Sequence, residues 1–318
     1  MTDPASAEGL IDTLQAWAGV LAELREFFAV RNVLEVQTPL ARDYGVTDPY
    51  QHCFQLIDPT AGGATAGFLQ PSPESAMKQL LAAGSGSIYQ LCKAFRAGES
   101  GSNHRTEFTM LEWYRVGYDH LQLMDEVADL VKDLLGPLPV ERLTWREAFI
   151  RHAGVDPVVA EVAQLSAQLP ESMSFSDDAE DAGRRRLILD RLLVSRVEPY
   201  LGHGCMTFLY DYPADQAALA RVRDDPWPVA ERFELYIKGL EIANGFHELN
   251  DSTEQRRRFE LDNRLRKQDG LAEAIIDEPL LNCLDHLPDC AGVALGVDRL
   301  IKISIGAGGL GDNMPVWA

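Results

Sequence analysis

Two predicted strands joined by a polar loop carry the residues whose types and spacing best suit chemistry. The first strand, at residues 88–95, is mostly apolar, and the loop after it contains two glycines and no run of hydrophobic residues. Arg96 stands at the end of this strand and faces the loop. On the returning strand side chains alternate between faces, so Glu112 and Tyr114 lie about 7 Å apart on one wall. Because a cation lies beside a polar loop, this hairpin is predicted to bind a phosphate.

A second predicted hairpin turns at Lys238 and brings two carboxylates together. With a two-residue turn, Glu241 opposes Tyr236 and Ala243 opposes Glu234, which puts both glutamates diagonally on one strand face. Like charges at that range are costly unless a cation or proton lies between them. Mg²⁺ prefers one or two carboxylates together with phosphate oxygens, so the pair predicts a Mg²⁺ site. The alternative interpretation is a solvated strand face.

Three segments resemble the motifs of the class II aminoacyl-tRNA synthetases, and specifically the lysine branch. Residues 88–116 resemble motif 2, with arginine at the loop entry and Glu-x-Tyr on the returning strand. Residues 291–306 resemble motif 3, a glycine-rich strand that leads into a helix beginning near Arg299. Residues 12–39 resemble motif 1, a long helix followed by a strand and a proline. The order and spacing of all three agree with the family.

The resemblance covers nearly the whole chain and implies an α/β (α+β) fold, in which an antiparallel sheet is flanked by helices. We expect one catalytic domain over residues 1–318, with residues 137–205 as a variable insertion. Motif 1 begins about ten residues into the chain, so no anticodon-binding domain is expected. In this family the motif 1 helix and strand form a dimer contact, which implies a homodimer. The apolar stripe from Leu14 to Phe28 is equally compatible with packing inside one chain.

The resemblance also assigns site residues. Arg96 and Arg299 match the catalytic arginines, and Glu234 and Glu241 match the Mg²⁺ ligands. The positions that match ATP contacts are Arg96, Ala97, Gly98, Glu99, His104, Arg105, Glu241, Ile242, Gly296 and Arg299. The positions that match amino-acid contacts are Ser72, Pro73, Glu74, Glu112, Tyr114, Asn244, Phe246, Glu248 and Ala294.

Three of these positions carry a further argument from the residues. Ser72 and Pro73 predict a helix start with serine as the cap, so Glu74 in the first turn could be a capping acid as well as a substrate contact. An Asn-Gly step beginning at Asn244 could insert a bulge that returns Glu248 to the ligand face. Ala294 stands where tRNA-charging relatives have glycine, and its methyl group could suit a lysine isomer with its amine on the β-carbon.

Composition limits the class of partner and the compartment. Lys and Arg total 29 against 49 acidic residues, and the net charge is −20. We expect no basic stripe, which argues against a large nucleic-acid footprint, although acidity can also serve solubility. Five cysteines without a Cys-x-x-Cys pair predict neither a disulfide framework nor a zinc site. Without a signal sequence or a long apolar run, a cytoplasmic protein without a membrane contact is predicted.

Among class II enzymes the chain most resembles the family of elongation factor P β-lysine ligases. Activation of lysine or (R)-β-lysine with ATP and Mg²⁺, and transfer from the adenylate to a lysine side chain of elongation factor P, are therefore expected. A tRNA-charging synthetase is the first alternative, disfavoured by the acidic charge and the expected absence of a tRNA-reading domain. A non-catalytic regulator that binds ATP or lysine is the second, disfavoured because Arg96, Glu234, Glu241 and Arg299 are all present.

Overall fold

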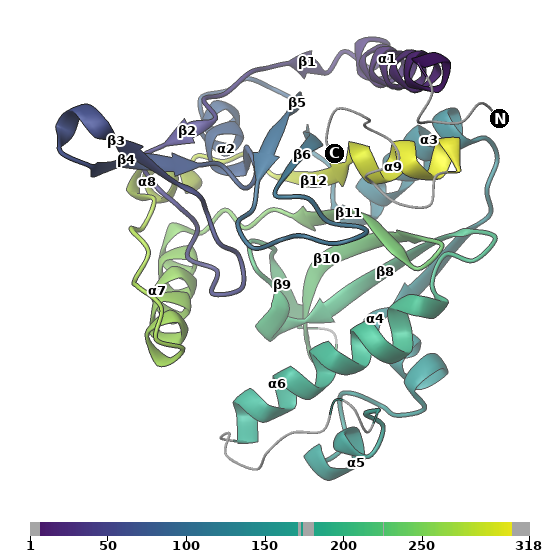
Figure 1. Ribbon diagram of the computed structural model, residues 1–318. Coiled ribbons are helices and arrows are strands. Elements are labelled where there is room, and N and C mark those ends of the chain that lie inside the picture. Colours follow the sequence, from purple (N-terminus) through teal and green to yellow (C-terminus); the bar gives the residue numbers. More distant parts are fainter. Residues whose placement is uncertain (1–6, 171–172, 174–180, 225, 307–318) are drawn as a thin grey trace. The chain divides into compact units, whose positions relative to one another are not determined.

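The computed structural model describes residues 7–170, 173, 181–224 and 226–306 (Figure 1). The chain divides into two compact units, the first comprising Met1–Leu123 with His247–Ala318 and the second Met124–Phe246. Helix α3 (His120–Leu135) and strand β11 (Leu240–His247) each carry the chain from one unit into the other.

The main strands of the first unit are the predicted motif 2 hairpin and its neighbours. They lie in the order β1 (Leu34–Glu35), β5 (Ile88–Phe95), β6 (Glu107–Val116) and β12 (Cys290–Gly296). The pairs β5–β6 and β6–β12 are antiparallel, as predicted, whereas the edge pair β1–β5 is parallel. A separate antiparallel sheet has the order β2 (Ala41–Arg42), β4 (Ala64–Leu69) and β3 (Gln55–Asp58), with the turn η1 (Pro59–Ala61) between β3 and β4.

Helices of the first unit pack on these strands and on each other. They are α1 (Ala7–Ala29), α2 (Glu74–Ala82), α7 (Ser252–Gln268), α8 (Glu278–Leu284) and α9 (Val297–Ile305). Helix α2 lies against α8, which in turn contacts α7 (Figure 1). Buried Met77 and Leu81 of α2 join Leu280 and Leu281 of α8 in one apolar cluster, which also includes Tyr114 of β6. This cluster fixes α2 against the strand that carries Glu112.

The apolar stripe of α1 has two different environments. Trp17, Leu24 and Phe28 are buried, and the Phe28 ring stacks on Tyr89 at 4.3 Å between centroids. Leu14 of the same predicted stripe is 43% exposed. The stripe is therefore partly intramolecular, and its N-terminal end leaves apolar surface uncovered within this chain.

Helix α2 begins one residue later than predicted. Pro73 takes the N-cap position instead of the first helical position, and no side chain caps the helix, so Ser72 is not the cap. Glu74 is the first helical residue, where a carboxylate favours the helix dipole. Its oxygen is bound by Lys78 one turn along, so Glu74 is more than a capping acid.

The second unit is a mixed sheet with its own core. Its strands lie in the order β11, β10 (Pro228–Ile237), β8 (Met206–Pro213) and β7 (Val140–Thr144), and β9 (Val222–Asp224) pairs with β10. Only the β7–β8 pair is parallel. The helical segments are α4 (Trp145–Ala148), η2 (Phe149–Ala153), α5 (Val162–Ser166), α6 (Asp181–Leu192), η4 (Leu193–Val197), η5 (Glu198–Tyr200) and η6 (Ala214–Gln216). Side chains of these helices and strands form one buried cluster that includes Phe149, Leu192 and Tyr236.

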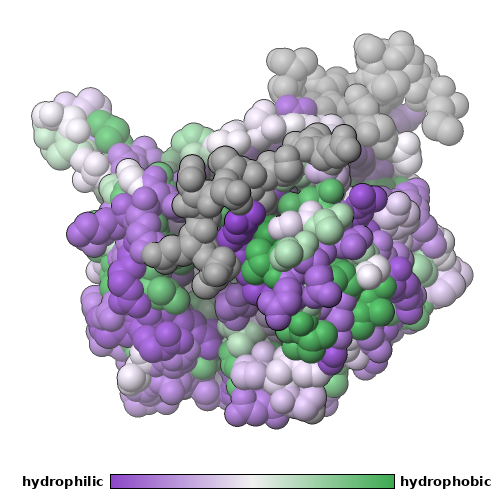
Figure 2. All heavy atoms as spheres, turned by 90° about the horizontal axis from the view of Figure 1, so that it is seen from below, coloured by the Kyte–Doolittle hydropathy of each residue, from purple (hydrophilic) through white to green (hydrophobic). Residues whose placement is uncertain are grey.

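The expectation of no basic stripe was wrong for α7. This helix carries six basic residues, namely Arg256, Arg257, Arg258, Arg264, Arg266 and Lys267. Glu254 binds Arg257 and Arg258, and Glu278 binds Arg256, so neighbouring carboxylates offset much of this charge. Hydrophilic residues cover most of the face shown in Figure 2. Among the described helices, none combines the length and apolar character needed to cross a bilayer.

Candidate active site

Three carboxylates and one ammonium group come together in the first unit. Glu74 and Lys78 lie on α2, Glu112 lies on β6, and Glu248 follows the end of β11. Lys78 Nζ lies 2.7 Å from Glu74 Oε1 and 2.6 Å from Glu248 Oε2. Tyr114 donates to Glu112 Oε1 at 2.7 Å. We call these five residues the amine pocket.

Burial sets the protonation of the amine pocket. Glu112 is 2% exposed and Glu248 is 1% exposed. Burial raises the pKa of Glu112 well above its ordinary value, and the charge of Glu74 raises it further despite the hydrogen bond from Tyr114. Burial also raises the pKa of Glu248, to about 7, although the charge of Lys78 opposes the shift. The pocket therefore takes up protons at neutral pH, a charge imbalance that bound cations would relieve.

Glu112 also has a buried oxygen without a donor. Its Oε2 has no hydrogen-bond partner among the described residues. A buried acceptor left unpaired costs free energy, so a donor from a ligand is the economical partner. Ala294 of β12 stands directly opposite Glu112, which places its methyl group beside this carboxylate. The position predicted to shape the pocket floor therefore adjoins a pocket carboxylate.

Gly292 allows two members of the amine pocket to approach the backbone of β12. It pairs with Tyr114 across the strands. A Cβ at this position would lie 2.3 Å from Tyr114 Cε1 and 2.5 Å from Glu248 Oε1. No side chain fits there without displacing one of these groups. Glycine is thus a condition for the observed geometry of the pocket, and the sequence alone did not reveal it.

The motif 2 loop brings three basic groups close together. Arg96 stands at the end of β5, where its backbone N–H donates to Thr106, and its Nη1 lies 3.8 Å from Glu99 Oε1. Burial lowers the pKa of His104, and Arg299 and Arg96 lower it further. Both arginines are therefore near the His104 ring. Such a concentration of positive charge suits a polyanion.

The remaining loop residues predicted to contact ATP lie around these groups. Ala97 donates its N–H to His52 at 2.8 Å, and Gly98 takes a positive φ of 82°. A backbone bridge joins Gly101 to His104, and half-buried Arg105 follows it. The loop therefore has a defined backbone path even where its sequence departs from the family.

Helix α9 is tied to this hairpin at its N-terminal end. Asp298 accepts a hydrogen bond from the Thr109 N–H at 3.1 Å, and Arg299 Nε donates to the Asn103 carbonyl at 3.4 Å. Gly296 is the N-cap. The N-terminus of a helix and a guanidinium both favour anions, so the start of α9 adds to the positive character of the loop.

In the second unit, the carboxylate hairpin has the predicted turn but not the predicted register. Lys238 and Gly239 both take positive φ, as a two-residue hairpin turn of type I′ requires. Glu241 opposes Tyr236 as predicted, but Leu235 opposes Ala243 and Glu234 opposes Asn244. The predicted pairing of Ala243 with Glu234 was wrong, because a bulge leaves Ile242 as an extra residue in β11. The irregularity lies before the Asn-Gly step, where a bulge had been considered.

Glu234 is held by three donors. The hydroxyls of Tyr212 and Tyr236 both donate to its Oε2 at 2.6 Å, and the guanidinium of Arg232 binds Oε1. Burial raises the pKa of both tyrosines, and Glu234 raises them further, so the phenols remain donors. Glu241 acts electrostatically on the same tyrosines and on Arg232. The two glutamates therefore share a surrounding, as predicted.

Arg232 also organises the predicted amino-acid contacts of this hairpin. Its Nε donates to Asn244 Oδ1 at 3.3 Å, and its guanidinium lies 6.0 Å from the centroid of the Phe246 ring. It stacks more closely over Tyr212, at 4.4 Å. Because Arg232 occupies the amide oxygen, the Asn244 amide is oriented with its NH₂ group turned away from the guanidinium.

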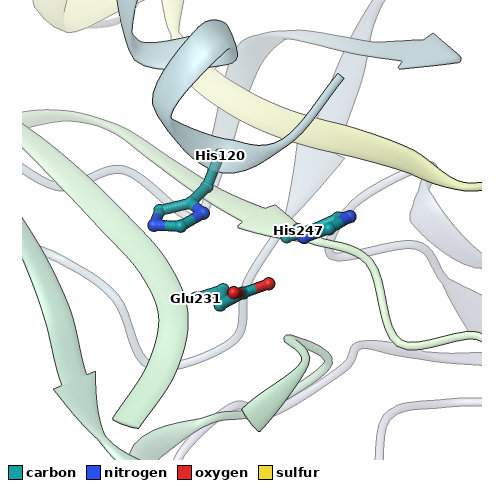
Figure 3. Close-up of side chains that lie close together, drawn as sticks. All are labelled: His120, Glu231 and His247. Atoms are coloured by element: carbon teal, nitrogen blue, oxygen red, sulfur yellow. The ribbon is translucent and has the colours of Figure 1, made fainter. Parts of the chain in front are cut away.

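Two histidines of the first unit form a separate feature (Figure 3). His120 begins α3 and His247 ends β11, and a ring nitrogen of each lies within 4.8 Å of the other. His247 Nε2 lies 3.0 Å from Asp289 Oδ1. Glu231, also drawn in Figure 3, belongs to β10 of the second unit, where it lies 3.6 Å from Arg223. The sequence had drawn attention to His247 only for its position near the carboxylate hairpin.

Sequence reasoning missed Lys78 and Arg232. A signal was available for each, because Lys78 follows Glu74 by four residues on a helix and Arg232 precedes Glu234 by two on a strand. These spacings place each pair on one face of its element. Burial of the pairs was the information that the sequence lacked.

Comparison with known proteins gives one family and close relatives. The profile of the family "tRNA synthetases class II (D, K and N)" matches residues 5–311. A protein of Yersinia enterocolitica named elongation factor P–(R)-β-lysine ligase is 48% identical over 298 residues, which is 93% of this chain and 91% of that protein. Proteins of the same name are 48% identical over 297 residues in Pseudoalteromonas translucida, covering 92% and 91%, and 46% identical over 305 residues in Salmonella typhi, covering 95% and 94%.

Proposed function

Because the chain belongs to the class II tRNA synthetase family of the D, K and N enzymes, we propose that it uses ATP to convert lysine or (R)-β-lysine into an aminoacyl adenylate. The observation that carries this proposal is the amine pocket. Three carboxylates, Glu74, Glu112 and Glu248, surround a buried space in which one oxygen has no donor. A substrate with two ammonium groups supplies the missing donors and charge.

Arg96 and Arg299 are proposed as the catalytic residues. In the activation step, the carboxylate of the amino acid attacks the α-phosphorus of ATP, the bond to the β-phosphate oxygen breaks, and pyrophosphate leaves. Arg96 and Arg299, which both lie near His104, would neutralise charge on the phosphates. Catalysis then depends on alignment and charge neutralisation, without a protein nucleophile.

The ATP contacts proposed for the rest of the chain follow the same division. In the first unit they are Ala97, Gly98, Glu99, His104, Arg105 and Gly296. In the second unit, Glu241 and Ile242 are proposed ATP contacts, and the bulge at Ile242 leaves this residue without a partner position in β10. Asn244 and Phe246 are proposed to contact the amino acid, as are Ser72, Pro73, Tyr114 and Ala294 of the first unit.

The carboxylate hairpin fits a divalent cation. Glu234 and Glu241 act on one guanidinium, that of Arg232, so the group of three carries a net charge of −1. Carboxylate oxygens are the donors that Mg²⁺ prefers. When bound, Mg²⁺ would neutralise phosphate charge, and Tyr212, Tyr236 and Arg232 would hold the Glu234 carboxylate in place.

The acceptor is proposed to be elongation factor P, which the names of the relatives specify for those proteins. The ε-amine of an acceptor lysine, once deprotonated, attacks the carbonyl carbon of the adenylate, an amide bond forms, and AMP leaves. Since the acceptor is a translation factor, the enzyme would work in the cytoplasm.

Pyrophosphate exchange with α-lysine and with (R)-β-lysine tests the first step, and mass spectrometry of elongation factor P tests the second. We expect Mg²⁺-dependent exchange and the addition of one lysine mass to a single lysine of the factor. Unmodified factor together with efficiently charged lysine tRNA would replace this function with that of a tRNA synthetase. Absence of exchange with both isomers, in a protein that binds ATP or lysine, would support a regulator.

We also propose that residues 1–318 act as one catalytic domain and that the chain is a homodimer through α1 and β1. Large apolar side chains in this region remain exposed, namely Ile11, Leu14, Val30 and Leu34. Exposed apolar groups that gather on neighbouring elements favour association. Sedimentation at micromolar concentration should give the mass of a dimer, and a monomer mass would reject this assignment.

A further inference from the structure

Lys78 is a buried cation in a place where a cation is costly. Its side chain is 1% exposed, and both of its carboxylate partners come from the amine pocket. Taking an ammonium group out of water carries a large penalty, and a buried ion pair seldom stabilises a fold more than apolar residues of similar volume. Stability alone therefore gives little reason for an ammonium group at this position.

The contacts of Lys78 orient both carboxylates. Lys78 holds Oε1 of Glu74 and Oε2 of Glu248. With Oε2 held, Oε1 of Glu248 lies over Gly292, beside the Tyr114 ring. One ammonium group thus connects α2 with the segment after β11 and fixes the direction of each carboxylate. A second effect is on charge, because three carboxylates and one ammonium group leave a net charge of −2 when all are ionised.

We propose that Lys78 is a positioning and specificity residue of the amine pocket, which orients Glu74 and Glu248 and reduces the pocket charge to match the two ammonium groups of a diamino acid. The inference rests on the proposed function, because it assigns a role within the same site. Without Lys78, the three carboxylates would exceed the charge of the substrate. At neutral pH they would hold more protons, which a bound diamino acid would have to displace.

The titratable groups around Lys78 come from four segments. Glu74 lies on its own helix, Glu112 and Tyr114 on β6, Cys283 on α8, and His247 and Glu248 at and after the end of β11. The charges of Glu248 and Glu74 raise the pKa of Lys78 despite its burial, so it stays charged over the range of enzyme assays. Loss of Lys78 would raise the pKa of Glu248 above its present value of about 7.

Lys78→Met tests the proposal, because methionine has a similar length and no charge. We expect the KM for the lysine isomer to rise about tenfold or more at pH 7, with a smaller change in kcat. The loss should diminish as the pH is raised toward 9, because the carboxylates of the variant then ionise. In Lys78→Ala, propylammonium chloride should restore part of the activity, whereas an equal concentration of sodium chloride should not.

Lys132→Met is the matched control, since Lys132 is a half-exposed helical lysine that pairs with Asp129 at 3.6 Å. It should keep the KM and the pH profile of the wild-type enzyme. If Lys78→Met does not fold, Glu74→Gln/Lys78→Met removes both charges of one pair, and the same rise in KM and alkaline recovery are expected from it. A wild-type KM and pH profile in either Lys78 variant would overturn the role of Lys78 alone. A wild-type enzyme that activates neither lysine isomer would reject the proposed function and this inference together.

Discussion

Gly292→Ala should separate the geometry of the amine pocket from the fold. The added methyl group would lie 2.3 Å from Tyr114 Cε1 and 2.5 Å from Glu248 Oε1, closer than real contacts of Cβ atoms allow. Tyr114 is 2% exposed and Glu248 is 1% exposed, so neither can turn into solvent. The ring, the carboxylate or strand β12 must shift by several tenths of an ångström, and the 2.7 Å hydrogen bond from Tyr114 to Glu112 would weaken.

The expected magnitude follows from these displacements. Overpacking a buried site costs about 1–3 kcal/mol, so the melting temperature should fall by several degrees while the protein remains folded. A displaced binding group can cost about a hundredfold in activity, so kcat/KM for the lysine isomer should fall by about that factor. Pyrophosphate exchange measures the activity, and scanning calorimetry measures the stability.

Gly45→Ala is the control for this substitution. A Cβ at Gly45 would meet Cys53 Sγ and Phe68 Cδ1 at 3.6 Å, which is ordinary van der Waals contact. Its activity and stability should remain close to those of the wild-type enzyme. Wild-type kcat/KM in Gly292→Ala would refute the reasoning, because it would mean that Tyr114 and Glu248 can move without consequence for the substrate.

Three further perturbations test other parts of the site. Lowering the pH from 7 to 6 should raise the KM for the lysine isomer at least about fivefold by steady-state kinetics, because Glu248, with a pKa of about 7, must lose its proton to accept an ammonium group; a flat profile would contradict this. Glu241→Gln should lower Mg²⁺-dependent pyrophosphate exchange about a hundredfold or more with an unchanged melting temperature, and normal exchange would remove the carboxylate hairpin from the reaction. Ala294→Gly should shift the ratio of kcat/KM values from (R)-β-lysine toward α-lysine by removing the methyl group opposite Glu112, and an unchanged ratio would show that this position does not select the isomer.

The sequence by itself determined the features that depend on neighbours along the chain. Strand β5 has the predicted bounds, and Glu112 and Tyr114 share a face because side chains alternate in any strand. The Lys238-Gly239 turn formed as predicted because both residues can take positive φ. The order of the three motifs was also sufficient to indicate the family, which the comparison with known proteins confirms.

Only the tertiary structure decided the register, the ion pairs and the protonation of the site. The bulge at Ile242 changed which residue faces Glu234, because one extra residue shifts the pairing of every residue beyond it. Lys78 became a pocket residue only when α8 and the strands buried α2, and Gly292 only when β12 met β6. The pKa of Glu248 depends on burial and on charges that lie far away in the sequence. These properties arise from contacts between distant segments, and residue spacing along the chain does not contain them.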